Sequence, residues 1–120
     1  MVSNSTPRDA LLDPKEFGRS PEVKLLDPTS RSGRIAHLQS QFAFAARVAL
    51  KNRRTTMIAF ASHVGMKPAR LGRLLRGTTP MKLEDIATIA NALNLTVDLV
   101  AEEQPGQPIS PASLAWLKRH

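Results

Sequence analysis

The sequence predicts an all-α protein, a compact bundle of about five short helices with an extended N-terminal arm and a short C-terminal tail. Three observations support this fold class. Aromatic residues make up only 4% of the 120 residues against 42% hydrophobic residues, so the core should consist mainly of aliphatic side chains and alanine. Apolar residues recur at helical spacing through the middle of the chain. Threonine, glycine and proline separate these periodic segments, at positions where helices begin or end.

Residues 1–33 are predicted to form a flexible or extended arm. Prolines interrupt this segment every seven residues, too often for a helix or a central strand, at Pro7, Pro14, Pro21 and Pro28. The tetrapeptide Leu-Leu-Asp-Pro occurs in it at positions 11–14 and again at 25–28. Two interpretations stay open: the repeat lies along the domain or docks a partner, or it is a chance feature of a low-complexity segment.

We expect a single folded domain over residues 34–101, beginning with a helix over 34–52 in which apolar residues fall at helical spacing. A second helix is predicted over 57–64, because Thr55 or Thr56 is a good N-cap for the apolar run that follows. Helix-ending residues follow this second helix directly, so the next helix must lie close to it in space.

Gly65 can adopt the positive φ that ends a helix, and Pro68 stands where the first turn of a third helix would begin. The third helix is predicted to run to about residue 75, with Gly77 ending it. Two short helices joined by a tight glycine turn, the second of them basic, form a helix-turn-helix. This geometry can place a helix in the major groove of DNA.

Charge is distributed very unevenly along the chain. The net charge is +7, yet the segment between Pro28 and Leu83 holds eleven basic residues and no Asp or Glu. The other six basic residues and all ten acidic residues lie outside it. A compact unit with such one-sided charge favours a polyanionic partner. Nucleic acid is favoured over an anionic membrane surface, because the basic residues are spread over several short helices and not along one long amphipathic helix.

A fourth helix is expected to start near Met81, with Glu84 and Asp85 in the first turn, where they complement the helix dipole. Apolar Leu95, Val97 and Leu99 recur at every second position, so the segment from Leu95 to Ala101 is either a short strand or a last amphipathic turn. Residues 102–120 are predicted to form a linker and a short C-terminal helix over 112–119.

No pattern of catalytic chemistry is present in the sequence. The three histidines are scattered, cysteine is absent, and neither a glycine-rich phosphate loop nor metal-ligand spacing occurs. We therefore expect a protein that is not an enzyme and has no catalytic residues, no metal and no cofactor. No apolar stretch has membrane-spanning length and no secretory signal is recognisable, which predicts a cytoplasmic protein without a membrane partner.

The middle of the chain resembles a known family of regulators. The run Phe-Ala-Ser-His-Val-Gly-Met at 60–66, followed by Leu71, Leu74 and Gly77, is similar to the helix-turn-helix of the lambda-repressor-like (Cro/XRE-type) DNA-binding proteins. The similarity continues through Pro80 and the segment 86–95, and it covers about residues 40–100.

This resemblance implies that the helix over 67–75 enters the major groove of double-stranded DNA. The residues implied to contact base edges are Lys67, Ala69, Arg70 and Arg73. Arginine or lysine pairs with guanine O6 and N7, so a G-containing half-site is expected. The flanking residues suited to backbone phosphates are Arg53, Arg54, Thr55, Thr56, Arg76, Thr78 and Thr79. Gly72, inside the third helix, either allows close approach to DNA or is simply tolerated.

The predicted function is a sequence-specific transcriptional repressor, of which phage immunity (lysogeny) repressors are one class. The alternative is the antitoxin of a toxin–antitoxin pair, which would bind a toxin protein through the Leu-Leu-Asp-Pro repeats or the tail around Trp116 and autoregulate its operon. A homodimer is expected, either through the segment from Leu95 to Ala101 or through the C-terminal tail.

Overall fold

The computed structural model describes residues 6–98 and 111–119 and confirms the all-helical fold. Its five α-helices are α1 (Arg31–Asn52), α2 (Met57–Val64), α3 (Pro68–Arg76), α4 (Leu83–Leu93) and α5 (Pro111–Arg119). Two short 3-10 helices precede them, η1 (Pro7–Ala10) and η2 (Pro14–Glu16). The only β pairing in the described ranges is an isolated bridge. No helix within them is both long enough and apolar enough to cross a membrane.

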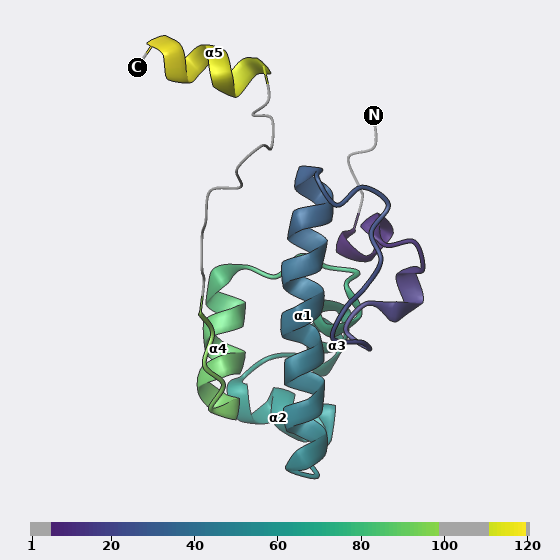
Figure 1. Ribbon diagram of the computed structural model, residues 1–120. Coiled ribbons are helices and arrows are strands. Elements are labelled where there is room, and N and C mark those ends of the chain that lie inside the picture. The colour runs from purple at the N-terminus through teal and green to yellow at the C-terminus, as the bar shows by residue number, and fades with distance from the viewer. Residues whose placement is uncertain (1–5, 99–110, 120) are drawn as a thin grey trace.

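Helix α1 is the central element of the domain. It contacts η1, α3 and α4, and in Figure 1 it lies between α4 on one side and the N-terminal arm on the other. Its buried side carries small residues, with Ala36, Ala43 and Ala46 fully buried, which allows the neighbouring elements to approach closely. Leucine and alanine supply most of the buried hydrophobic residues, as the low aromatic content predicts.

Helix α1 starts at Arg31, three residues before the predicted start at Arg34. Ser30 is the N-cap: its Oγ accepts a hydrogen bond from the Gly33 N–H at 2.9 Å and donates one to the Asp27 carbonyl at 2.9 Å. The sequence-based interpretation missed this cap because glycine and serine favoured a loop at this point. The first basic residues of the acid-free segment are therefore helical.

Three of the helices end in the same way. Gly65, Gly77 and Asn94 follow α2, α3 and α4 in the left-handed conformation, with φ of 73°, 79° and 56°. The residue after each one donates its N–H to the carbonyl five positions earlier, at 2.8–3.0 Å. This closing arrangement satisfies carbonyls that the helix itself leaves unpaired.

Helix α4 starts at Leu83, two residues later than predicted, because Met81 belongs to the preceding connection. Met81 is buried, and its N–H and carbonyl pair with the side-chain amide of Gln39 on α1 at 3.1 and 3.2 Å. The Asp85 carboxylate accepts the Lys82 N–H at 2.9 Å and thereby begins the helix. The α3–α4 connection is thus held firmly against α1.

The N-terminal arm is extended, one of the two predicted forms, and it packs against the domain more closely than its composition suggested. Leu11 and Phe17 are 2% and 1% exposed, so residues 6–30 contribute directly to the core. The two Leu-Leu-Asp-Pro copies lie side by side: Leu11 and Leu25 form an antiparallel bridge, flanked by backbone hydrogen bonds of 2.9 Å. Of the interpretations left open, the structure supports a repeat that lies along the domain.

The aspartate of each repeat caps the turn that follows it. Asp13 accepts the Lys15 N–H at 3.1 Å, and Asp27 accepts both the N–H and the hydroxyl of Thr29 at 3.0 and 2.7 Å. These bonds from Thr29 hold the pKa of Asp27 below its ordinary value. Each copy therefore combines a buried or half-buried leucine with an exposed leucine and a capping acid.

After α4, the structure describes residues 95–98 and helix α5. Leu95 to Asp98 have no regular secondary structure, and the rest of the predicted strand or turn, 99–101, lies outside the described residues together with the linker at 102–110. Helix α5 begins at Pro111, one residue before the predicted start. All its residues are exposed, including Leu114 and Leu117 at 41% and 50%.

Candidate nucleic-acid interface

Helices α2 and α3 form the predicted helix-turn-helix pair. The Thr56 hydroxyl accepts the Ala59 N–H at 3.1 Å and caps α2, which spans the predicted residues 57–64. Gly65 turns the chain, and Pro68 occupies the first position of α3, where its missing N–H costs nothing. Ala61 is fully buried between the two helices, so they can cross closely.

The two sides of α3 differ sharply. Leu71, Leu74 and Leu75 are fully buried and hold the helix against the domain. The opposite side is exposed and basic. It carries two of the four residues predicted to contact base edges, Ala69 and Arg73, followed by Arg76, and a third, the exposed Lys67, lies at its start as the N-cap of α3. We call this surface the outer face of α3.

Arg70, the fourth predicted base-contacting residue, is directed elsewhere. Its two Nη atoms donate to the two carboxylate oxygens of Asp85 at 2.9 and 3.0 Å. This is the only ion pair among the described residues, and its side chains are 33% and 8% exposed. The hydrogen bond from Arg70 lowers the pKa of Asp85, and the same bond raises the pKa of Arg70. Arg70 therefore ties α3 to the first turn of α4.

A signal for this pair was present in the sequence. Asp85 belongs to the first two acids after the acid-free segment and lies fifteen residues from Arg70. The sequence-based argument gave Asp85 only a role at the helix dipole. Because Asp85 lies in the first turn of α4, soon after the basic helix α3 in the chain, an ion pair between Asp85 and an arginine of α3 could have been predicted.

Four predicted phosphate-contacting residues lie in the α1–α2 connection. Thr56 is occupied as the α2 cap, and the Thr55 hydroxyl donates to the Arg53 carbonyl at 3.3 Å. Arg53 Nη2 donates to the Leu93 carbonyl at the end of α4 at 2.6 Å, so part of its hydrogen-bonding capacity is used within the fold. Arg54 is exposed and has a φ of 54°.

The other three predicted phosphate-contacting residues lie at the end of α3. Arg76 is exposed, whereas Thr78 and Thr79 are half-buried and the Thr78 hydroxyl donates to the Arg73 carbonyl at 3.3 Å. Gly72 is buried beneath Arg76: a Cβ on Gly72 would lie 2.8 Å from Arg76 Nη1. The predicted set thus divides into two groups, one at the start of α2 and one at the end of α3.

Arg47 and Arg19 were missed by the sequence argument. Arg47 on α1 donates from Nη2 to the Leu75 carbonyl at 3.1 Å. It shares a helical side with the buried Ala43 and Leu50, and an arginine at such a position in the sequence is the signal that could have identified it. Arg19 lies in the arm, outside the acid-free segment, and nothing in the sequence distinguishes it.

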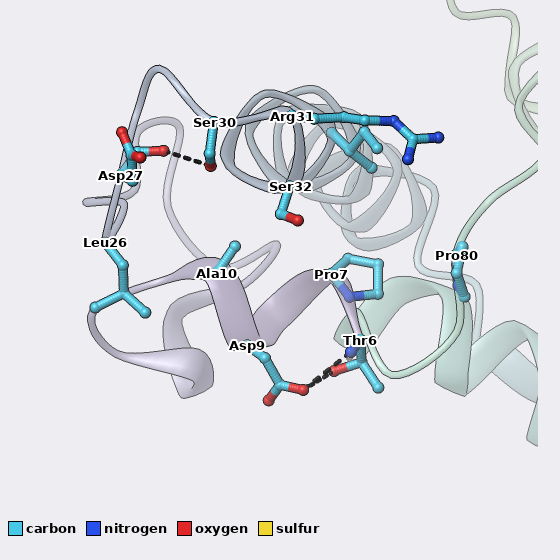
Figure 2. Close-up of a pocket in the computed structure, with 11 residues that line it drawn as sticks. Thr6, Pro7, Asp9, Ala10, Leu26, Asp27, Ser30, Arg31, Ser32 and Pro80 are labelled. Atoms are coloured by element: carbon cyan, nitrogen blue, oxygen red, sulfur yellow. Dashed lines mark hydrogen bonds between the residues drawn. The ribbon is translucent and has the colours of Figure 1, made fainter. Parts of the chain in front are cut away.

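A separate cleft of about 500 Å³ lies between the arm and the start of α1. Figure 2 shows η1 on one side of it, with Pro7 and Ala10, and Ser30 and Ser32 of the α1 start on the other. Arg31 lies at its edge with the guanidinium directed away from the labelled carboxylates. None of the cleft's lining residues belongs to α2 or α3.

Comparison of the chain with family models found no match, and comparisons with curated proteins and with solved structures found none either. The described residues contain no group of three side chains suited to hold a metal ion. The feature of the site with the largest chemical consequence is the outer face of α3, whose exposed Arg73 and Arg76 form no ion pair with any described residue. Such a surface attracts an anion that carries many charges.

Proposed function

We propose that this protein is a sequence-specific DNA-binding transcriptional repressor that places α3 in the major groove of duplex DNA. The observation that carries this proposal is the division of α3 into two sides. Three fully buried leucines fix one side to the domain, and the other exposes Lys67, Ala69 and Arg73. A helix that enters a groove needs both a rigid attachment and a polar side with donors for base edges.

The roles of the outer-face residues follow from their chemistry. Arg73 and Lys67 donate to guanine O6 and N7, and Ala69 contacts a thymine methyl group. Arg70 is left out of the base-contacting set, because its guanidinium fork is already matched by the Asp85 carboxylate. It acts as a positioning residue that sets the angle of α3 relative to α4.

The start of α2 supplies the contacts that position the protein on the duplex. Thr55, Thr56 and Arg54 lie at the N-terminus of α2, a usual position for a backbone phosphate, where the Thr56 hydroxyl already accepts the Ala59 N–H. Each phosphate contact releases counterions, so affinity must fall steeply as the salt concentration rises.

Selection of binding sites from random duplexes at two salt concentrations tests the proposal. We expect an enriched G-containing motif and weaker binding at the higher salt. Arg73→Ala should flatten the preference at one base pair, at a cost of about 1–3 kcal/mol in discrimination. Arg34→Ala removes an equally exposed positive charge on α1 and is the matched control. A selection that enriches no motif, or affinity independent of salt, contradicts the proposal.

Repression is the activity that needs least besides binding, because a tightly bound domain blocks a promoter by occupying it. A phage immunity repressor is one form of such a protein. A cytoplasmic location fits DNA binding of this kind. Operator occupancy measured together with transcription from the same promoter tests this step, and binding that leaves transcription unchanged contradicts it.

The antitoxin alternative has one observation in its favour. Helix α5 exposes the apolar Leu114 and Leu117, which suits a segment that packs on another protein. Both Leu-Leu-Asp-Pro copies, in contrast, are used in the packing of the arm. Co-purification with a small protein encoded next to it, lost in a Leu114→Ser, Leu117→Ser variant, would support the antitoxin function.

Dimerisation on DNA is part of the proposal. The route runs either through the segment from Leu95 to Ala101, of which Leu95 to Asp98 are described, or through the exposed helix α5. Two copies would then contact half-sites about 34 Å apart, one turn of the double helix. A sedimentation mass of one chain, both free and on DNA, contradicts this route.

A further inference from the structure

A fixed arginine lies where α1, α3 and the arm meet. Arg47 is half-buried, and its Nη2 donates to the Leu75 carbonyl at the end of α3. Its Nε is buried without a hydrogen-bond partner, next to Gly18 of the arm, where a Cβ would lie 3.3 Å from it. The guanidinium therefore cannot swing freely, and its charge stays at this junction.

Two exposed arginines directly follow, in the chain, the residues that Arg47 contacts. Arg19 follows Gly18 in the arm, and Arg76 is the last residue of α3. Burial, and then the positive charges of Arg19 and Arg76, lower the pKa of Arg47. The single ion pair of the described residues is the one between Arg70 and Asp85, so none of these three arginines forms an ion pair within the described part of the chain.

The three arginines are continuous with the outer face of α3. Arg76 folds back over Gly72, because its Nη1 occupies the space that a Cβ at Gly72 would need. Residues three and four positions apart share a helical side, so Arg76 continues the side of α3 that carries Arg73. The basic surface thus extends from the outer face of α3 across α1 to the arm.

We propose that Arg19, Arg47 and Arg76 form a phosphate-binding site that holds the DNA backbone at the C-terminal end of α3. Arg19 and Arg76 donate to the phosphate oxygens, and Arg47 is the fixed charge between them. Guanidinium groups match phosphate geometry with paired N–H donors, and an anion removes the mutual repulsion of the three cations. This inference rests on the proposed DNA binding and adds the arm to the interface.

The test compares Arg19→Ala with Lys15→Ala, which removes an equally exposed charge from the same arm. We expect Arg19→Ala to reduce the slope of log affinity against log salt by about 0.9, the value of one phosphate contact, and to leave sequence preference unchanged. Lys15→Ala should keep the wild-type slope. Equal slopes for the wild type and both variants would overturn the inference. Both side chains are exposed, so unfolding curves should match the wild type.

A second measurement separates this site from the proposed function. Inorganic phosphate, titrated into the full chain, should shift the amide NMR signals of Gly18 and Arg76, and Arg19→Ala should abolish the shift while Lys15→Ala retains it. If the wild type shows this shift but binds no duplex, the proposed DNA binding is wrong. The three arginines then bind free phosphate and not the phosphates of the DNA backbone. If duplex binds with normal salt dependence and Arg19→Ala changes nothing, only the further inference falls.

Discussion

The arm and the helix-turn-helix pair satisfy their backbones by different means. In α2 and α3 the hydrogen bonds are local, and one glycine ends each helix. In the arm, the local bonds of short turns are joined by bonds to distant residues: the Arg8 N–H donates to the Gly77 carbonyl at 3.0 Å, and the Gly18 N–H donates to the Ser40 hydroxyl at 2.9 Å. An element held by local hydrogen bonds can be predicted from its own residues, whereas an element held by distant partners cannot.

The largest effect is expected at Phe17, where the arm enters the core. This side chain is 1% exposed, and Phe17→Ala should lower the free energy of unfolding by about 3–5 kcal/mol, measured by denaturant titration. Leu12→Ala, in the same arm but 59% exposed, should change it by less than about 0.5 kcal/mol. If Phe17→Ala lowered the free energy of unfolding only slightly, the arm would lie on the domain without contributing to its core.

Gly65 and Gly77, which end α2 and α3, distinguish a helix end that is held locally from one that is packed against the arm. Both have positive φ, so alanine costs about 1–2 kcal/mol at either position. A Cβ at Gly65 meets nothing within 4 Å, but one at Gly77 would lie 2.6 Å from the Phe17 ring. Gly77→Ala should therefore cost about 2–4 kcal/mol, clearly more than Gly65→Ala. In a Phe17→Ala background, the two glycine substitutions should lower the free energy of unfolding by the same amount. If they already do so in the wild-type background, the contact between Gly77 and the Phe17 ring is refuted.

The smallest effect concerns the link between α3 and α4. Asp85→Asn should cost about 1–2 kcal/mol, less than a fully buried pair would, because Arg70 is a third exposed. The pKa of Asp85 lies below its ordinary value of 3.8, so its stabilisation is present above that pH and is lost as the pH falls through the lower, folded-state value. Asp9 and Asp27, with lowered pKa values as well, add to the same acid loss.

The Asp85 contribution is obtained by comparing pH profiles of unfolding for the wild type and Asp85→Asn. The two stability curves should converge in acid, where the wild-type carboxylate is protonated. Curves that stay parallel down to the lowest pH would show that the ion pair with Arg70 does not contribute to stability.

The sequence predicted the elements whose signals are local. The bounds of α2 and the start of α3 follow from Thr56, Gly65 and Pro68, each of which acts on its own neighbours. The start of α1 was missed because Ser30 had two possible roles, and the periodicity begins only after the first turn. Met81 was placed inside α4 because its partner, Gln39, lies 42 residues away.

The candidate site was predictable to a similar degree. Ala69 and Arg73 fall on the exposed side of α3 because the buried leucines occupy the other side, and Lys67 is exposed because it precedes the helix as its N-cap. The pairing of Arg70 with Asp85, and the meeting of Arg19 with Arg47, depend on how separate elements pack. No spacing within a single helix contains that information.

The packing of Phe17 beneath Gly77 has a practical consequence for the limits of the domain. A chain shortened to begin at residue 34, where helical periodicity first becomes visible, would lose both Leu11 and Phe17 and leave an apolar hollow beside the last turn of α3. Such a fragment should be unstable and prone to aggregate, although it retains every residue of the helix-turn-helix. The folding unit therefore includes the arm from Leu11 onward.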